Sequence, residues 1–337
     1  MPTFCRHNRL LQNCPICTRE QEVELRPVVS SSAPGATSRA DAPRDGTPSR
    51  SGSPSPSARA GRGSKSLAGV RVRRLARGID DGYRSPLVPG LRSSADAQRL
   101  AEELAFAAAR LSRLATDPPG LYAEIAAAGD LEERTWLAFL IAYVCPSEGE
   151  DPFAAIRRIR TTWASGQPPD LAAIETGPRT AHDPARRGAE TIEAYRAWAR
   201  RAGSQAAAFT GEAAWGAPRR FARVFERIAL PGFHRDARFE LLVSLGRLGA
   251  YELRAGTLAL GGENAVTVAA KRALGIGDPL LLERRAAELA SACGLPLEAL
   301  DLGFYNWERG ERASLGLPPR SAPDPDALSS ARAALRL

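Results

Sequence analysis

The apolar positions of the chain are spaced for helices from Ser94 onward. In Asp96–Ala115 apolar side chains recur every three or four residues, with arginine and glutamate between them, and a pair of prolines ends the pattern. Leu131–Cys145 is nearly all apolar on one side and ends before a proline. Similar patterns predict further helices at Asp151–Trp163, Ala189–Ala202, Pro218–Ala229, Asp236–Leu248, Ala265–Leu274, Pro279–Cys293 and Pro296–Glu308. No stretch alternates with period two and is rich in β-branched residues, so we expect an all-α fold.

The same pattern divides the chain into segments. Residues 30–66 contain no Val, Ile, Leu, Met or aromatic residue, so they cannot bury an apolar face. We therefore expect a disordered linker over residues 23–92, a helical domain over 93–320 with a surface loop at 174–188, and a C-terminal tail over 321–337. The 337 residues are 44% apolar and 25% charged, which is enough to form a core. No apolar run approaches the roughly 18 residues that span a bilayer, and the N-terminus lacks a signal-peptide pattern. These features predict a soluble, cytoplasmic monomer without a membrane partner or a redox cofactor.

The net charge of +8 is concentrated in one segment of the predicted linker. Residues 39–77 hold ten basic and two acidic residues, which accounts for the whole excess. A flexible cation of this kind binds phosphates without sequence preference, and salt weakens its binding. The alternative is a solubilising tether that has no partner.

The segment ahead of the linker holds the densest set of metal ligands in the sequence. Cys5, His7, Cys14 and Cys17 fall within thirteen positions and include three of the five cysteines. Thiolates and an imidazole are the ligands of tetrahedral Zn²⁺, and the Cys-x-x-Cys spacing gives a chelating turn. We therefore expect a structural zinc knuckle over residues 1–22. A chance cluster remains an alternative, and no βαβ pattern supports a redox role.

A short Leu-Pro-Gly segment predicts a tight turn between two helices. It lies within Arg227–His234, between the predicted helices Pro218–Ala229 and Asp236–Leu248. Gly232 allows backbone amides to face outward, and the N-terminus of the second helix adds its dipole, so the turn is a candidate phosphate site. An ordinary corner between two helices is the other interpretation.

Downstream, Glu263–Ile276 reads as a capped helix with a basic end and a glycine stop. With the turn, this segment resembles the helix-hairpin-helix DNA glycosylase superfamily, whose hairpin reads L-P-G-V-G-x-K-T-A and whose catalytic segment reads V-D-x-H-V-x-R-V-x-x-R-L-G. Counting back eleven positions from Gly275 places Asn264 at the family's catalytic aspartate. Phe139–Glu148 resembles the helix end that lines the family's flipped-base pocket, which implies Tyr143 and Glu148 as pocket residues. A buried core tyrosine and a solvated loop carboxylate are the alternatives.

The departures from the family motif bear on mechanism. His234 stands where the hairpin has its second glycine, and Asp236 stands where some members have a lysine nucleophile. An aspartate cannot form a Schiff base, so the resemblance implies a monofunctional enzyme. Asn264 replaces the aspartate, with Glu263 as the adjacent carboxylate, so either residue is the catalytic candidate. No iron–sulfur cysteine set follows the domain, and Cys293 alone is expected to be a small buried residue.

The C-terminal part carries a narrower resemblance. The sequence here is similar to that of bacterial proteins described as α-glutamyl/putrescinyl-thymine pyrophosphorylase-like. The similar segments are the N-terminal cysteines, Lys271 to Pro279, Leu282 to Ala286, Leu300-Asp301 and Asn306-Trp307-Glu308. That group is related to glycosylases and to hypermodified bases of phage DNA. The resemblance implies Asn306 and Trp307 as base-pocket residues; packing of the tryptophan in the core is the alternative.

Together these features predict a DNA glycosylase that excises a modified, phage-type base from double-stranded DNA, with a role in anti-phage defence. The expected DNA-binding residues are Gly232, His234, Arg235, Lys271 and Arg272. Two alternatives stay open. One is an enzyme that builds hypermodified thymine, as the narrower resemblance suggests, and the other is a non-catalytic binder of modified DNA, which the missing aspartate favours.

Overall fold

A computed structural model describes residues 78–337, except 128, 184, 186–187 and 319–320. The described residues form helices joined by loops, with no strand among them, which confirms the all-α prediction. The helices are α2 (Ser94–Thr116), α3 (Leu121–Ala127), α4 (Leu131–Val144), α5 (Ala154–Ile159), α6 (Gly188–Arg201), α7 (Gln205–Thr210), α8 (Ala217–Arg227), α9 (Arg235–Arg247), α10 (Ala265–Leu274), α11 (Pro279–Ala292), α12 (Ala299–Arg309) and α13 (Pro325–Leu335). Over these segments, no helix combines the length and the apolarity needed to cross a bilayer.

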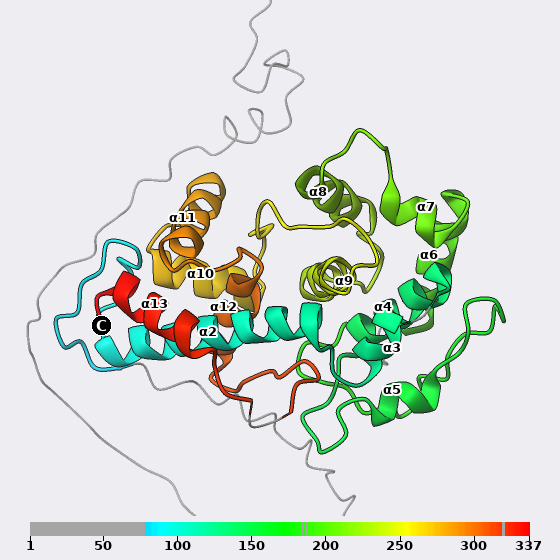
Figure 1. Ribbon diagram of the computed structural model, residues 1–337, viewed down its shortest axis with the longest axis horizontal. Helices are drawn as coiled ribbons and strands as arrows, with labels where there is room; N and C mark the ends of the chain where they lie inside the picture. Colours follow the sequence, from blue (N-terminus) through cyan, green and yellow to red (C-terminus); the bar gives the residue numbers. More distant parts are fainter. Residues whose placement is uncertain (1–77, 128, 184, 186–187, 319–320) are drawn as a thin grey trace, which may run out of the picture. The chain divides into compact units, whose positions relative to one another are not determined.

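The helices pack into two groups, which lie to the left and right in Figure 1. The terminal lobe consists of α2 and α10–α13, which come from the two ends of the described chain. The central lobe consists of α3–α9. Helix α2 also contacts α9, so the long helix joins the two lobes. The chain therefore enters the central lobe once and returns from it once, between α9 and α10.

Each lobe has a helix that is buried along most of its length. In the central lobe this is α4, whose Phe139 ring stacks on Tyr195 with centroids 3.8 Å apart. In the terminal lobe it is α12, which is buried from Ala299 to Trp307. Gly303 of α12 allows close packing on α2, because a Cβ atom there would lie 2.7 Å from a methyl group of Leu104. These continuous apolar runs explain why the pattern predicted both helices.

The structure differs from the predicted boundaries at both ends of the helical domain. Val88 and Leu91, assigned to the linker, are buried, and the Gly90 N–H donates to the Ala273 carbonyl over 3.0 Å. Residues 321–337, assigned to a tail, contain α13, which packs on α2 and buries Leu335. The helical domain therefore extends from about residue 78 to the C-terminus of the chain.

One predicted helix is shorter than expected. The pattern predicted a helix over Asp151–Trp163, but α5 covers only Ala154–Ile159. Beyond it, the Trp163 N–H donates to the Glu133 carboxylate over 3.0 Å, and the Trp136 indole donates to the Thr161 carbonyl over 2.8 Å. These bonds to α4 replace helical bonds, so tertiary contacts end the helix early.

Candidate functional site

The turn between α8 and α9 is the hairpin that the sequence predicted. Gly232 has φ of 74°, a left-handed conformation that glycine adopts at no steric cost. Two side chains from elsewhere hold the turn: the Thr191 hydroxyl donates to the Pro231 carbonyl over 2.8 Å, and His234 Nε2 lies 3.1 Å from the Thr180 carbonyl. A carbonyl only accepts, so Nε2 carries the hydrogen in this contact. His234 is the N-cap residue of α9, and its side chain makes no capping bond.

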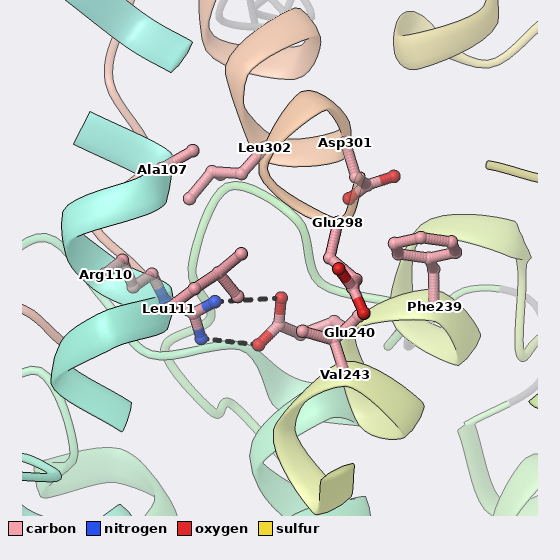
Figure 2. Close-up of a pocket in the computed structure, with 9 residues that line it drawn as sticks. All are labelled: Ala107, Arg110, Leu111, Phe239, Glu240, Val243, Glu298, Asp301 and Leu302. Carbon is pink, nitrogen blue, oxygen red and sulfur yellow. Dashed lines mark hydrogen bonds and ion pairs between the residues drawn. The ribbon is translucent and has the colours of Figure 1, made fainter. Parts of the chain in front are cut away.

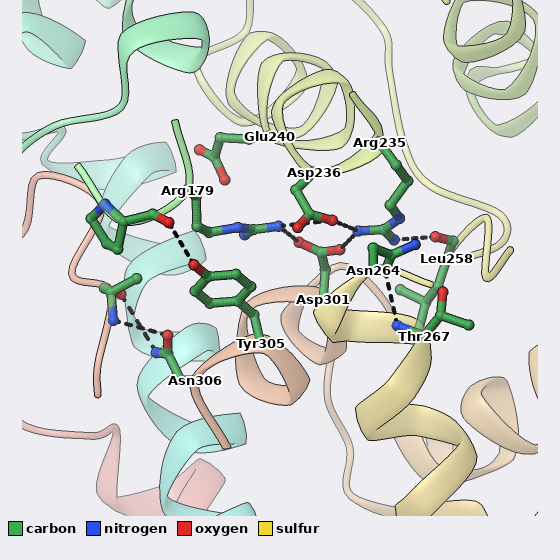
Figure 3. Close-up of polar contacts among 12 residues, drawn as sticks. Arg179, Arg235, Asp236, Glu240, Leu258, Asn264, Thr267, Asp301, Tyr305 and Asn306 are labelled. Carbon is green, nitrogen blue, oxygen red and sulfur yellow. Dashed lines mark hydrogen bonds and ion pairs between the residues drawn. The ribbon is translucent and has the colours of Figure 1, made fainter. Parts of the chain in front are cut away.

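Arg235, the first residue of α9, points into the protein. Its guanidinium donates to Asp301 of α12 and to the Leu258 carbonyl, and Nη1 lies 3.2 Å from Asp236 Oδ1. Arg179, from the loop before α6, donates to the other oxygen of Asp301 over 2.7 Å. Figure 3 shows these side chains meeting at the boundary between the two lobes. We call Arg179, Arg235, Asp236 and Asp301 the boundary ion cluster.

A second buried ion pair lies next to this cluster. Arg110 of α2 donates to both oxygens of Glu240 of α9, with Nη2 2.5 Å from Oε1 and Nη1 3.4 Å from Oε2 (Figure 2). Arg110 Nη2 also donates to the Tyr122 hydroxyl over 3.2 Å, and the Ser244 hydroxyl donates to Glu240 Oε1 over 2.8 Å. The cavity beside this pair has a volume of about 10 Å³, close to the roughly 10–15 Å³ that one water needs. Little space is left for a ligand here.

Mutual attraction keeps these buried groups charged. Burial alone raises the pKa of Asp301, but the charges and hydrogen bonds of Arg179 and Arg235 outweigh burial and hold the pKa below its ordinary value. Burial lowers the pKa of Arg179, yet the nearby carboxylates, first Asp301 and then Asp236, raise it above its ordinary value. Arg110 shows the same balance, with Glu240 as its main partner. The boundary therefore holds buried side chains that are charged.

The N-terminus of α10 holds the predicted catalytic asparagine. Asn264 is the N-cap residue: its Oδ1 accepts from the Thr267 N–H over 2.9 Å, and its Nδ2 donates to the Gly261 carbonyl over 2.8 Å. Gly275 ends the helix in the left-handed conformation. One lone pair of Oδ1 and one hydrogen of Nδ2 remain for other partners. Glu263 is exposed and makes no hydrogen bond within the described part of the chain.

One side chain of α9 contacts the loop that leads into α10. Arg235 bonds to the carbonyl of Leu258, which lies six residues before Asn264 in the segment that leads into α10. Figure 3 draws Asn264 and Thr267 with the cluster, and the bond that links Arg235 to this part of the chain goes to the Leu258 carbonyl. The boundary ion cluster is therefore connected to the loop that leads into α10.

The four predicted base-pocket residues do not line one pocket. The Tyr143 hydroxyl donates to the Gly188 carbonyl over 3.0 Å and lies 3.2 Å from His182 Nδ1, inside the central lobe. Trp307 packs in the terminal lobe, where its indole donates to the Asp96 carbonyl over 3.0 Å. The Glu148 carboxylate accepts from the Ser314 N–H over 2.9 Å. The Asn306 side-chain oxygen accepts from the Ala313 N–H over 2.9 Å. All four side chains hold the fold together in this structure.

The predicted DNA-binding side chains also differ in their accessibility. Lys271 is exposed in the last turn of α10. Arg272 lies over the Trp307 ring at 3.9 Å and pairs with Glu308 at 2.9 Å. Arg235 is 8% exposed, so its guanidinium is not presented to a phosphate. The metal-ligand candidates Cys5, His7, Cys14 and Cys17 lie outside the described residues.

Comparisons with known proteins add no family to this description. The chain matches no protein-family model, and neither a curated protein nor a solved structure is significantly similar to it. The function is therefore argued from the site alone.

Proposed function

We propose that this chain is a DNA N-glycosylase-like hydrolase that removes a modified base and leaves an intact abasic strand. The observation that carries the proposal is the contact of the hairpin helix α9 with the loop that leads into α10, through the bond from Arg235 to the Leu258 carbonyl, at the boundary of two helical lobes. A boundary between two lobes is a common place for a ligand site. Here it combines a phosphate-type turn, a polar N-cap and carboxylates.

DNA binding would use the turn and the first turn of α9. The His234 side chain does not cap α9, and the helix dipole favours negative charge at this end, where His234 is exposed and the next three residues are buried. Lys271 supplies an exposed cation, and the basic segment of residues 39–77 would add affinity without sequence preference.

The chemistry would be hydrolysis of the N-glycosidic bond of a nucleotide flipped out of the duplex. Asn264 retains one acceptor and one donor, which is enough to orient a water molecule. Asp236 cannot form a Schiff base, so the product would be an abasic site without strand cleavage.

A second candidate function is binding of modified DNA without catalysis. The observation in its favour is that Asn264 makes the ordinary pair of bonds of a helix N-cap, which explains the residue without any reaction.

The test is to incubate the full chain with DNA from phages that carry different modified bases and to measure abasic sites. Alkali should be needed to cleave the product strand. Asn264→Asp keeps the N-cap acceptor and should retain activity, whereas Asn264→Ser keeps a cap but removes the amide and should lose most of it. Equal melting temperatures of the two variants provide the control for folding. Binding to modified DNA without abasic sites would favour the second candidate.

A further inference from the structure

The carboxylates at the lobe boundary differ in whether both of their oxygens have hydrogen-bond partners. Four acids lie there, Asp236, Glu240, Glu298 and Asp301, and the two oxygens of Glu298 accept from Arg247 and from the Ala255 N–H. Asp301 is 2% exposed, and its two oxygens accept from Arg235 and Arg179 respectively. Both oxygens of Glu240 accept from Arg110. These three carboxylates have no oxygen left for a substrate.

Asp236 is different. Its Oδ1 accepts from Arg235 over 3.2 Å and lies 3.9 Å from Arg179. Its Oδ2 has no hydrogen-bond partner among the described residues, and it is not one of the buried unpaired atoms. The side chain is 12% exposed, so this single oxygen opens to solvent while the rest of the group is held in place.

The position of Asp236 is also suited to a reacting centre. It is the second residue of α9, four positions after Gly232 of the hairpin. Arg235 connects it to the Leu258 carbonyl, and thus to the segment that carries Asn264 (Figure 3). A carboxylate held in place by guanidinium groups in a largely buried position acts more strongly on a developing charge than one in water. Glu263, the other carboxylate candidate, is exposed and has no such support.

We infer that Asp236 is the catalytic carboxylate of the proposed hydrolase, with Oδ2 facing the sugar and the attacking water. This inference rests on the proposed function. The water oxygen forms the new bond to C1′ while the bond from C1′ to the base nitrogen breaks, and the base leaves with that electron pair. Asp236 Oδ2 takes the proton of the water and later releases it to solvent, and the departing base takes a proton from solvent. Asp236 also offsets the positive charge that the sugar develops.

The first test uses binding, so it does not require the natural base to be known. Two duplex oligonucleotides carry, at one position, either a cationic pyrrolidine analogue of the sugar or its neutral tetrahydrofuran counterpart. Because a transition-state mimic binds more tightly than a neutral analogue, the full chain should prefer the cationic duplex by about 10-fold or more. Asp236→Asn should abolish the preference without weakening binding to the neutral duplex. Glu212→Gln, at an exposed position outside the site, is the matched control and should keep the preference.

The second test uses the rate of abasic-site formation under single-turnover conditions, on the modified DNA that the wild type cleaves. Asp236→Asn should lower this rate by roughly 100-fold or more, the usual effect of removing a general base, and the control Glu212→Gln should leave it nearly unchanged. Asp236→Ser is the second variant if Asp236→Asn does not fold. Equal binding of both duplexes by the wild type, or a wild-type rate in a folded Asp236 variant, overturns the inference. Failure to bind either duplex instead overturns the proposed function.

Discussion

Neutralising Glu240 should destabilise the protein strongly, because it leaves the charge of Arg110 buried without its partner. The two side chains are 2% and 9% exposed, and their closest atoms are 2.5 Å apart. Glu240→Gln keeps the volume of the side chain, so the loss measures electrostatics rather than a cavity. Breaking a buried pair on one side costs about 3–5 kcal/mol. At about 2–4 °C per kcal/mol for a domain of this size, the melting temperature should fall by roughly 6–20 °C.

A surface pair of equal length provides the matched control. Arg157 and Asp151 are also 2.5 Å apart, but their side chains are 44% and 54% exposed. Asp151→Asn should therefore change the free energy of unfolding by less than about 1 kcal/mol. Replacing both partners of the buried pair, with Arg110→Met and Glu240→Leu together, should recover most of the lost stability, because no charge is then left unpaired.

The assay is urea and thermal unfolding followed by circular dichroism for the four proteins, with equal denaturant slopes as the check on two-state behaviour. If Glu240→Gln and Asp151→Asn lowered stability by the same amount, burial would not control the strength of these pairs. The reasoning about the lobe boundary would then be wrong.

Three further predictions concern pH, metal and salt. Because the pKa of Asp301 is lowered in the folded protein, its contribution is present at neutral pH and lost as pH falls below about 4, so Asp301→Asn should flatten the acid side of the stability curve. The full chain should carry one Zn²⁺, lost when Cys14→Ser and Cys17→Ser are combined; elemental analysis of the wild type without zinc contradicts this. Deleting residues 39–77 should weaken DNA binding for all sequences and reduce the slope of log K against log salt, and an unchanged slope excludes phosphate contacts by this segment.

The sequence predicts a helix well where local signals mark both ends. α10 covers the predicted residues, because the Asn264 cap and the Gly275 stop are both local. α13 was missed although Asp324-Pro325 is a start signal of the same kind: the Asp324 side chain accepts from the Ala327 N–H over 2.7 Å. The polar residues around it suggested a tail, and only packing on α2 shows that the helix has a partner.

The ion pairs of the lobe boundary are harder to predict from the sequence than the helix ends. Arg110, Glu240 and Asp301 each stand in an apolar run, at a helix position that faces the core. A charge at such a position indicates a buried partner, but helical periodicity cannot identify it. Arg110 and Glu240 are 130 residues apart, and Arg179 and Asp301 are 122 residues apart. These pairs are set by how the two lobes meet.

His234 has a structural role at the position where the helix-hairpin-helix motif that the sequence resembles has a glycine. A glycine at position 234 would have no side chain to reach the Thr180 carbonyl, whereas His234 makes this contact and ties the turn to the loop before α6. The same loop carries Arg179, which binds Asp301 of the terminal lobe. The turn, the loop and α12 are therefore linked in series. A ligand held by the turn would therefore be connected to the buried Arg179–Asp301 pair through the exposed contact between His234 and the Thr180 carbonyl.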